Sequence, residues 1–169
     1  MDATKDEIIA ALGLRPHPTC GYVAESFRSA HMLPRTALPA RFDGPRPMGQ
    51  VLTFLVAPEA RILLHRIRAD QMYHFYLGDP LEVLLLYPDG RGEVVRMGGD
   101  VGRGGRLQLL IPGDTFHMSR PVGPRGFSLL ATTEWPAVEP ADVEAGDPAA
   151  LAAAYPAMAA AIRDFAAAD

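Results

Sequence analysis

The stretch LLHRIRADQMYHFYLGDPLEVLLLY, residues 63–87, decides the fold of this chain. It falls within three strand-like runs, residues 61–68, 71–77 and 81–87, and the last of these consists mostly of branched apolar residues. The breaks between the runs are Ala69-Asp70 and Gly78-Asp79-Pro80, which contain residues that turns prefer. Runs of this kind between turn residues predict consecutive antiparallel strands of a β-sandwich or barrel.

Polar side chains distinguish this stretch from an ordinary hairpin. His65, Gln71 and His74 occupy positions where a purely structural strand more often carries Val, Ile or Thr. Strand parity places Gln71 on one face with Tyr73 and Phe75, and His74 on the opposite face. We expect Tyr73 and Phe75 to form core or pocket wall, with a ring face available to a ligand. His74 is expected in a sheet or subunit contact, unless a bulge turns it into the pocket as a substrate-binding residue.

Length and composition limit the class of protein. A chain of 169 residues predicts one domain, 1–169, with a sizeable core. The net charge of −4 gives no basic surface for nucleic acid or an anionic membrane, and no apolar run approaches the roughly 20 residues of a membrane span. The single cysteine, Cys20, excludes an intrachain disulfide and has no identifiable activating neighbour. We expect a soluble, cytoplasmic protein without nucleic-acid or membrane partners.

The rest of the chain predicts further short strands between two helical ends. Thr4 and Glu7 form a capping-box pattern that starts a leading helix within residues 1–14. The strands are expected over residues 21–29, 50–56, 93–97, 106–111, 117–120 and 127–133. Residues 30–49 are rich in Pro and Gly and are interpreted as a long irregular loop, either a lid or a surface excursion. Two short helices, interrupted by Pro156, are expected in a tail over residues 147–167.

This arrangement resembles the cupin superfamily. The segments HRIRADQMYHFYLGDPLEVLLLYPDG (65–90) and LQLLIPGDTFHM (107–118) resemble the two cupin motifs. HPTCGYVAESFRS (17–29) is similar to the first strand of small cupins related to the sugar-nucleotide 3,5-epimerase of the rhamnose pathway. The best match is a group of small bacterial and fungal cupins of uncharacterised function, over about residues 15–155. The resemblance implies an all-β, antiparallel double-stranded β-helix, that is, a jelly-roll barrel over residues 15–135.

Two departures from the cupin pattern bear on metal binding. The pattern usually has Asp-Glu before the second strand, whereas this chain has Asp70-Gln71, and Ile67 replaces the second histidine of His-x-His. His117 falls where metal-binding cupins carry their last ligand. A site of His65, Gln71 and His117 would contain fewer strong donors than a tight transition-metal site uses. We therefore expect no cofactor, with a divalent transition metal at these three residues as the alternative.

Three residues are candidates for catalysis. His65 shares a strand face with Leu63 and Ile67, which in a barrel is the inner face, and a neutral histidine there can act as a general base. Its alternative is a satisfied core histidine. The resemblance implies that His117 lines the pocket and that Glu25 points into it. The alternative for Glu25 is an ion pair with a barrel arginine such as Arg66.

Gln71 and Gln108 are candidate substrate-binding amides, the latter on the last strand before the Pro112-Gly113 turn. The alternative for Gln108 is a solvated sheet face.

Three functions fit these residues. The first is a metal-independent isomerase, epimerase or cyclase/dehydratase that acts on a small carbonyl or polyhydroxylated metabolite. His65 would be the base, while Glu25, Gln71 and His117 would orient the substrate or stabilise an enolate-like intermediate. The second is a metal-dependent cupin enzyme of the dioxygenase type, and the third is a non-catalytic protein that binds a small metabolite. By analogy with other small cupins, we expect a homodimer.

Overall fold

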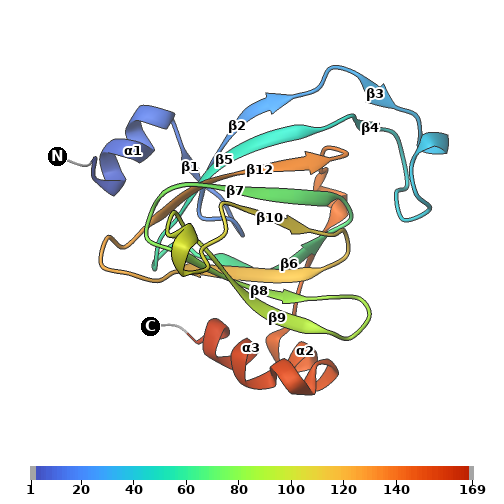
Figure 1. The fold of residues 1–169 in the computed structure, drawn as a ribbon. Helices are drawn as coiled ribbons and strands as arrows, with labels where there is room; N and C mark the ends of the chain where they lie inside the picture. Colours follow the sequence, from blue (N-terminus) through green and yellow to red (C-terminus); the bar gives the residue numbers. More distant parts are fainter. Residues whose placement is uncertain (1–2, 168–169) are drawn as a thin grey trace.

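The computed structural model describes residues 3–167 and confirms the expected antiparallel β architecture with helices at both ends (Figure 1). One sheet has six strands in the order β1 (Arg15–Pro16), β2 (Tyr22–Arg28), β5 (Gln50–Val56), β12 (Ser128–Trp135), β7 (Asp70–Gly78) and β10 (Gln108–Ile111). The other has five, in the order β13 (Val143–Ala145), β6 (Ile62–Ile67), β11 (Phe116–Pro121), β8 (Leu81–Leu86) and β9 (Gly92–Met97). The stretch that decided the fold thus supplies β6, β7 and β8.

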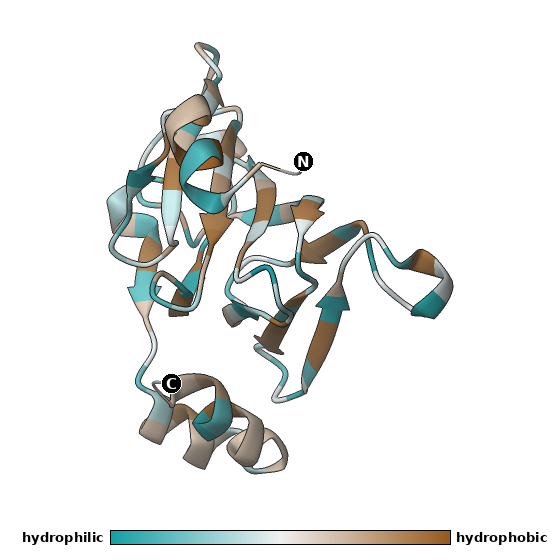
Figure 2. Cartoon of the chain, turned by 90° about the vertical axis from the view of Figure 1, so that its left-hand side faces the viewer, coloured by the Kyte–Doolittle hydropathy of each residue, from teal (hydrophilic) through white to brown (hydrophobic). Residues whose placement is uncertain are grey.

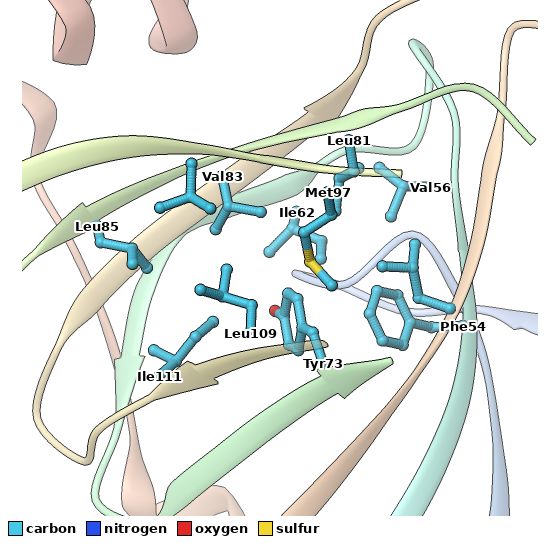
Figure 3. Packing of buried hydrophobic residues seen from close by; sticks show 12 residues of the cluster. Phe54, Val56, Ile62, Tyr73, Leu81, Val83, Leu85, Met97, Leu109 and Ile111 are labelled. Carbon is cyan, nitrogen blue, oxygen red and sulfur yellow. The ribbon is translucent and has the colours of Figure 1, made fainter. Parts of the chain in front are cut away.

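The two sheets enclose one apolar core. The six-stranded sheet contributes Phe54, Tyr73 and Ile111, and the five-stranded sheet contributes residues such as Val83 and Leu85 (Figure 3). Full burial of each aliphatic or aromatic side chain stabilises the fold by about 1.5–3 kcal/mol. Figure 2 shows long hydrophobic stretches along the strands, with hydrophilic residues on the helices, in the loops and at several strand ends. The jelly-roll sandwich is therefore held by the inward faces of its strands.

Helices cover parts of the outer faces of both sheets. Helix α1 (Lys5–Leu12) begins at the predicted Thr4–Glu7 capping box and ends at Gly13, whose φ of 63° is the left-handed conformation that glycine tolerates. Ile8 of α1 packs on the six-stranded sheet in a cluster with Leu55 and Leu129. At the other end, α2 (Pro148–Ala154) and α3 (Ala159–Ala166) are joined by the 3₁₀ turn η4 (Pro156–Met158). This turn confirms the predicted break at Pro156. The apolar faces of both helices cover the five-stranded sheet.

The segment 30–49 is more ordered than the irregular loop predicted for it. It contains a two-residue ladder of β3 (Met32–Leu33) with β4 (Arg46–Pro47) and the 3₁₀ turn η1 (Arg35–Ala37). It extends beyond the sandwich as an arm at the upper right of Figure 1. Leu38 and Phe42 of this arm are buried against Ile67 and Ala69. The prolines set its extended path, and the two apolar side chains fix it to the end of β6.

Two further 3₁₀ turns, η2 (Val101–Arg103) and η3 (Pro140–Asp142), lie in the connections before β10 and β13. Within residues 3–167, no helix is both long enough and apolar enough to cross a membrane.

Candidate functional site

A cavity of about 450 Å³ lies between the two sheets. Its walls come from β2, β5 and β12 with the start of β7, from β6 opposite, and from the segments 17–20 and 138–143. Its buried polar residues are Gln50, His65, Gln71, Thr132 and Glu134. No residue of the arm 30–49 lines it, so residues 138–143 border this cavity and the segment considered as a lid does not.

His65 and His117 form a buried pair of rings. They are register partners on β6 and β11, with ring centroids 4.3 Å apart. Nδ1 of His65 lies 2.7 Å from the Leu63 carbonyl oxygen, and Nδ1 of His117 lies 3.2 Å from that of Thr115. Because a carbonyl only accepts, each Nδ1 carries the proton, which leaves each Nε2 with a lone pair. Burial lowers the pKa of His65. Burial, together with the adjacent His65 ring, also holds the pKa of His117 well below its usual value.

Gln71 forms a hydrogen bond with His117 but not with His65, so the two histidines differ in what they can bind. Its Nε2 lies 3.2 Å from Nε2 of His117 and donates to it, while its Oε1 accepts from the Thr132 hydroxyl at 3.3 Å. The His117 ring is completely buried and lies behind the wall, outside the set of lining residues. His65 Nε2 therefore faces the cavity with the Cys20 thiol 4.0 Å away, whereas the pocket-lining position expected for His117 is wrong.

The donor set does not fit a resident transition metal. Catalytic zinc sites use three protein ligands, and a transition metal prefers carboxylate, imidazole or thiolate to a neutral amide. Gln71 turns its amide nitrogen toward His117 and its oxygen toward Thr132. Across residues 3–167, no three His, Cys, Asp or Glu side chains gather in a way that would hold a metal ion. We derive no chemical step through a metal.

Glu134 is the residue that the sequence interpretation missed. It lies on β12 opposite Gln71 of β7 and Gln50 of β5, with only 5% of its surface exposed. Gln50 Nε2 donates a hydrogen bond to its Oε2. Burial raises the pKa of Glu134 to about 7, although the Gln50 hydrogen bond and the charge of Arg28 act in the opposite direction. A carboxyl that titrates near neutrality can both hold and release a proton.

The signal for Glu134 was present in the sequence. Leu130, Thr132 and Glu134 alternate along one strand, so they share the face that Leu130 buries in the core. Parity along this strand places Glu134, one residue beyond the predicted end at residue 133, inside the barrel.

A chain of hydrogen bonds links the Glu134 carboxyl to Arg28, which is partly exposed to solvent. Its Nη1 donates to Gln50 Oε1 at 2.6 Å, and its Nη2 donates to Glu139, which lies beside the cavity. Gln50 in turn donates to Glu134. The result is a continuous chain of hydrogen bonds from a half-buried arginine to the buried carboxyl, with Gln50 held in one orientation by its two partners.

Glu25 lies outside the cavity, contrary to the inward position expected from the cupin resemblance. Its side chain is 48% exposed and lies 3.4 Å from Arg28 Nη1. The register of β2 with β5 shifts between Glu25 and Phe27, which marks a bulge. This extra residue cancels the parity that would place Glu25 and Arg28 on opposite faces. Glu25 does form an ion pair, but with Arg28 rather than Arg66, which pairs with Glu144.

A second bulge corrects the face assigned around His65. His117 pairs with His65 and Ser119 with Ile62, so β6 carries one residue more than β11 between these pairs. Ile62 is therefore buried in the cavity wall and Leu63 is 50% exposed, although parity grouped Leu63 with His65 and Ile67. His65 and Ile67 do face inward as predicted.

The remaining candidates lie on both sides of the six-stranded sheet. His74 points outward, as parity predicted, with Nε2 3.0 Å from Thr133 Oγ1 and Nδ1 3.1 Å from Gln108 Nε2. Gln108 is exposed, so its placement as a pocket amide is wrong and its solvated alternative holds. Tyr73 lines the cavity, whereas Phe75 packs against the apolar core without reaching the cavity.

Cys20 lines the cavity near His65, with Sγ 4.0 Å from His65 Nε2. Burial raises the pKa of this thiol to about 11. A thiol with this pKa is protonated at neutral pH and is a poor nucleophile.

The double-sheet jelly roll, with a ligand-sized cavity between its sheets, defines this chain as a cupin-type barrel. The family model described as Cupin superfamily (DUF985) matches residues 6–146, and the chain belongs to this family.

Solved structures agree with this assignment. A hypothetical protein from Leishmania major is 30% identical, with a TM-score of 0.84 over 97% of this chain and 99% of that one. A protein from Shewanella oneidensis is 27% identical, with a TM-score of 0.83 over 99% of this chain and 100% of that one. A variant of oxalate decarboxylase from Bacillus subtilis shares the fold alone, with 12% identity and a TM-score of 0.51 over 90% of this chain and 37% of that one. No curated protein matches the sequence.

Proposed function

We propose that the chain is a small-molecule enzyme of the isomerase, epimerase or cyclase/dehydratase type that transfers protons in the cavity without a metal. One observation carries the proposal: a histidine lone pair and a carboxyl with a pKa of about 7 line the same largely apolar cavity. Groups whose pKa values are displaced toward neutrality in a cavity are typical of acid–base sites.

In this mechanism His65 is the base and Glu134 the acid. Neutral His65 accepts a proton from a carbon or oxygen of the substrate at Nε2, and its Nδ1–H stays on the Leu63 carbonyl and fixes the ring. Protonated Glu134 supplies a proton to a second position of the same molecule. Its pKa of about 7 means that near neutral pH a large fraction carries the proton to be given. Exchange with solvent returns both groups to their starting states.

His117 and Gln71 act in this scheme as positioning residues. The Gln71 amide occupies His117 Nε2, and the His117 ring packs against His65 at 4.3 Å. Gln71 itself is fixed by the Thr132 hydroxyl. This buried network keeps His65 Nε2 pointing into the cavity, and neither His117 nor Gln71 reacts with the substrate.

The test is solvent proton exchange on a panel of small carbonyl compounds in D₂O, followed by NMR. Wild-type protein is expected to exchange the α-protons of at least one compound. His65→Ala is expected to reduce that rate by roughly 10²–10⁴-fold, as for loss of a general base. Gln108→Ala, on the outer face, is the matched control and keeps the wild-type rate. A His65→Ala protein that exchanges as fast as wild type would refute the proposal.

Two other functions remain open to measurement. A non-catalytic binding protein, which the mostly apolar cavity also suits, would hold a ligand tightly and release it unchanged. A dioxygenase-like enzyme would require a stoichiometric metal lost on replacing His65 and His117. Elemental analysis after reconstitution with zinc, iron, manganese and nickel separates this alternative from metal-independent chemistry.

We also propose that the chain forms a homodimer. Edge strand β10 carries Leu110 at 51% exposure, with Leu107 at 50% beside it, and exposed apolar side chains at a sheet edge favour association. A gel-filtration mass of about twice 18.2 kDa is expected, and a mass that matches the monomer would overturn this proposal.

A further inference from the structure

The cavity is lined without a single cationic side chain. Of the residues that form its wall within the described range 3–167, none is Lys or Arg, and its two acidic residues are Glu134 and Glu139. Two histidines, His17 and His65, lie in the wall; burial lowers the pKa of both below 6.5, so both are neutral at pH 8. An anionic ligand would therefore lose its hydration without gaining a counter-charge, and it would meet carboxylates instead.

Arg28 does not supply the missing positive charge. Its guanidinium lies beside the cavity wall but is already bonded to the Gln50 amide and paired with the carboxylates of Glu139 and Glu25. Two negative partners neutralise its charge, so a phosphate or carboxylate of a ligand would have to displace one of them.

The neutral polar groups of the wall are also largely used. Gln50 has its oxygen on Arg28 and its nitrogen on Glu134, and Gln71 has its nitrogen on His117 and its oxygen on Thr132. The polar groups left for a ligand include His65 Nε2, the His17 ring and the rest of the Glu134 carboxyl. The surrounding wall is apolar and includes Val23, Leu52, Phe54, Ile62, Ile67 and Val138. A polyhydroxylated ligand would leave most of its hydroxyl groups unpaired against this surface.

We infer that the cavity takes an uncharged molecule with an apolar body and one polar reactive group, such as a ketone, and discriminates against carboxylated or phosphorylated molecules of similar size. This inference rests on the proposed function in that it names the substrate class of the same site. Of the two substrate classes that the sequence left open, carbonyl and polyhydroxylated metabolites, the cavity favours carbonyl compounds. It also separates this cavity from one built for a sugar nucleotide, whose diphosphate needs cationic partners.

The experiment is a binding comparison by calorimetry at pH 8 with 4-phenylbutan-2-one and 3-phenylpropanoate, two probes of nearly equal shape. UDP-glucose serves as a diphosphate probe. The ketone is expected to bind at least tenfold more tightly than the carboxylate, with no binding of UDP-glucose. Glu139→Gln frees Arg28 from one partner and is expected to tighten carboxylate binding about threefold or more relative to ketone binding. Glu144→Gln, which removes the same charge from an exposed pair with Arg66, is the matched control and has no such effect.

Three results would overturn the inference: equal or tighter binding of either anion to the wild type, no ketone binding at millimolar concentration, or equal gains in the two variants. These outcomes differ from failure of the proposed function. Binding is measured without turnover, so a cavity that prefers anions yet exchanges protons through His65 would overturn the inference alone. A cavity that prefers the ketone, with exchange independent of His65, would overturn the proposed function alone.

Discussion

Replacing Glu134 by glutamine is expected to stabilise the protein increasingly as the pH rises from 5 to 8. The carboxyl is 5% exposed, and burial raises its pKa from 4.5 to about 7. Since the pKa of Glu134 in the fold lies above that in the unfolded chain, between pH 4.5 and about 7 the folded protein binds a proton that the unfolded chain has mostly lost. The stability associated with this proton is present below pH 4.5 and is lost as the pH rises through 7. The neutral amide of glutamine keeps the shape and accepts the Gln50 hydrogen bond without this loss.

The magnitude follows from the displacement of the pKa. A difference between 4.5 and about 7 corresponds to about 3 kcal/mol, at about 1.4 kcal/mol for each pKa unit. Because the wild-type carboxyl is mostly protonated in the fold at pH 5, the advantage of Glu134→Gln there is under about 1 kcal/mol. At pH 8 it approaches about 3 kcal/mol. Most of the change falls between pH 5 and 7.

The assay is urea unfolding of both proteins at pH 5, 6, 7 and 8, followed by far-ultraviolet circular dichroism. The difference in unfolding free energy at each pH cancels the contributions of the histidines, which are the same in both proteins. A difference that stays constant with pH, or that falls as the pH rises, would refute the reasoning. It would show that Glu134 is ionised in the fold at its ordinary pKa.

Three further changes have defined outcomes. In the Glu134→Gln background, acidification from pH 6.5 to 5.5 is expected to lower the unfolding free energy by about 1 kcal/mol through His117 alone, because the pKa of His117 in the fold lies below that in the unfolded chain. Adding His117→Gln should remove this part of the pH dependence in urea titrations. Phe54→Ala is expected to cost about 3–5 kcal/mol of stability by denaturant unfolding, since its ring is 2% exposed and packs 5.1 Å from Tyr73; a loss below about 1 kcal/mol would contradict this packing. Arg28→Ala removes a charge that lowers the pKa of Glu134, so the alkaline limb of any proton-exchange profile should move to higher pH, whereas a purely structural role would leave the limb in place.

Local patterns predicted the strands and helices because turn residues and caps act over a few positions. Gly78-Asp79-Pro80 separates β7 from β8 as expected, and the Thr4 cap begins α1. The same reasoning placed Gln71 and Tyr73 at the cavity and His74 outside it, since β7 has no irregularity over these residues.

Parity failed where a strand gains a residue. The bulges in β2 and β6 depend on how each strand fits its neighbour, which no pattern within one strand reveals. The bulge in β2 brought Arg28 to the face that carries Glu25, and the bulge in β6 exchanged Leu63 for Ile62 in the cavity wall. The burial of His117 and the partnership of Gln50 with Glu134 depend on pairing between distant strands. The sequence therefore indicated that His65 faces the cavity and missed the carboxyl that shares it.

The pH dependence of proton exchange tests the central claim most directly. Deuterium incorporation from D₂O into the best compound of the carbonyl panel, measured by NMR between pH 5 and 9, is predicted to be bell-shaped. The rate should fall at low pH as His65 becomes protonated, and above about pH 7 as Glu134 loses its proton. Glu134→Gln should lower the rate and abolish the alkaline limb while keeping the acid limb. A profile that is flat, or an alkaline limb that persists in Glu134→Gln, would contradict the account.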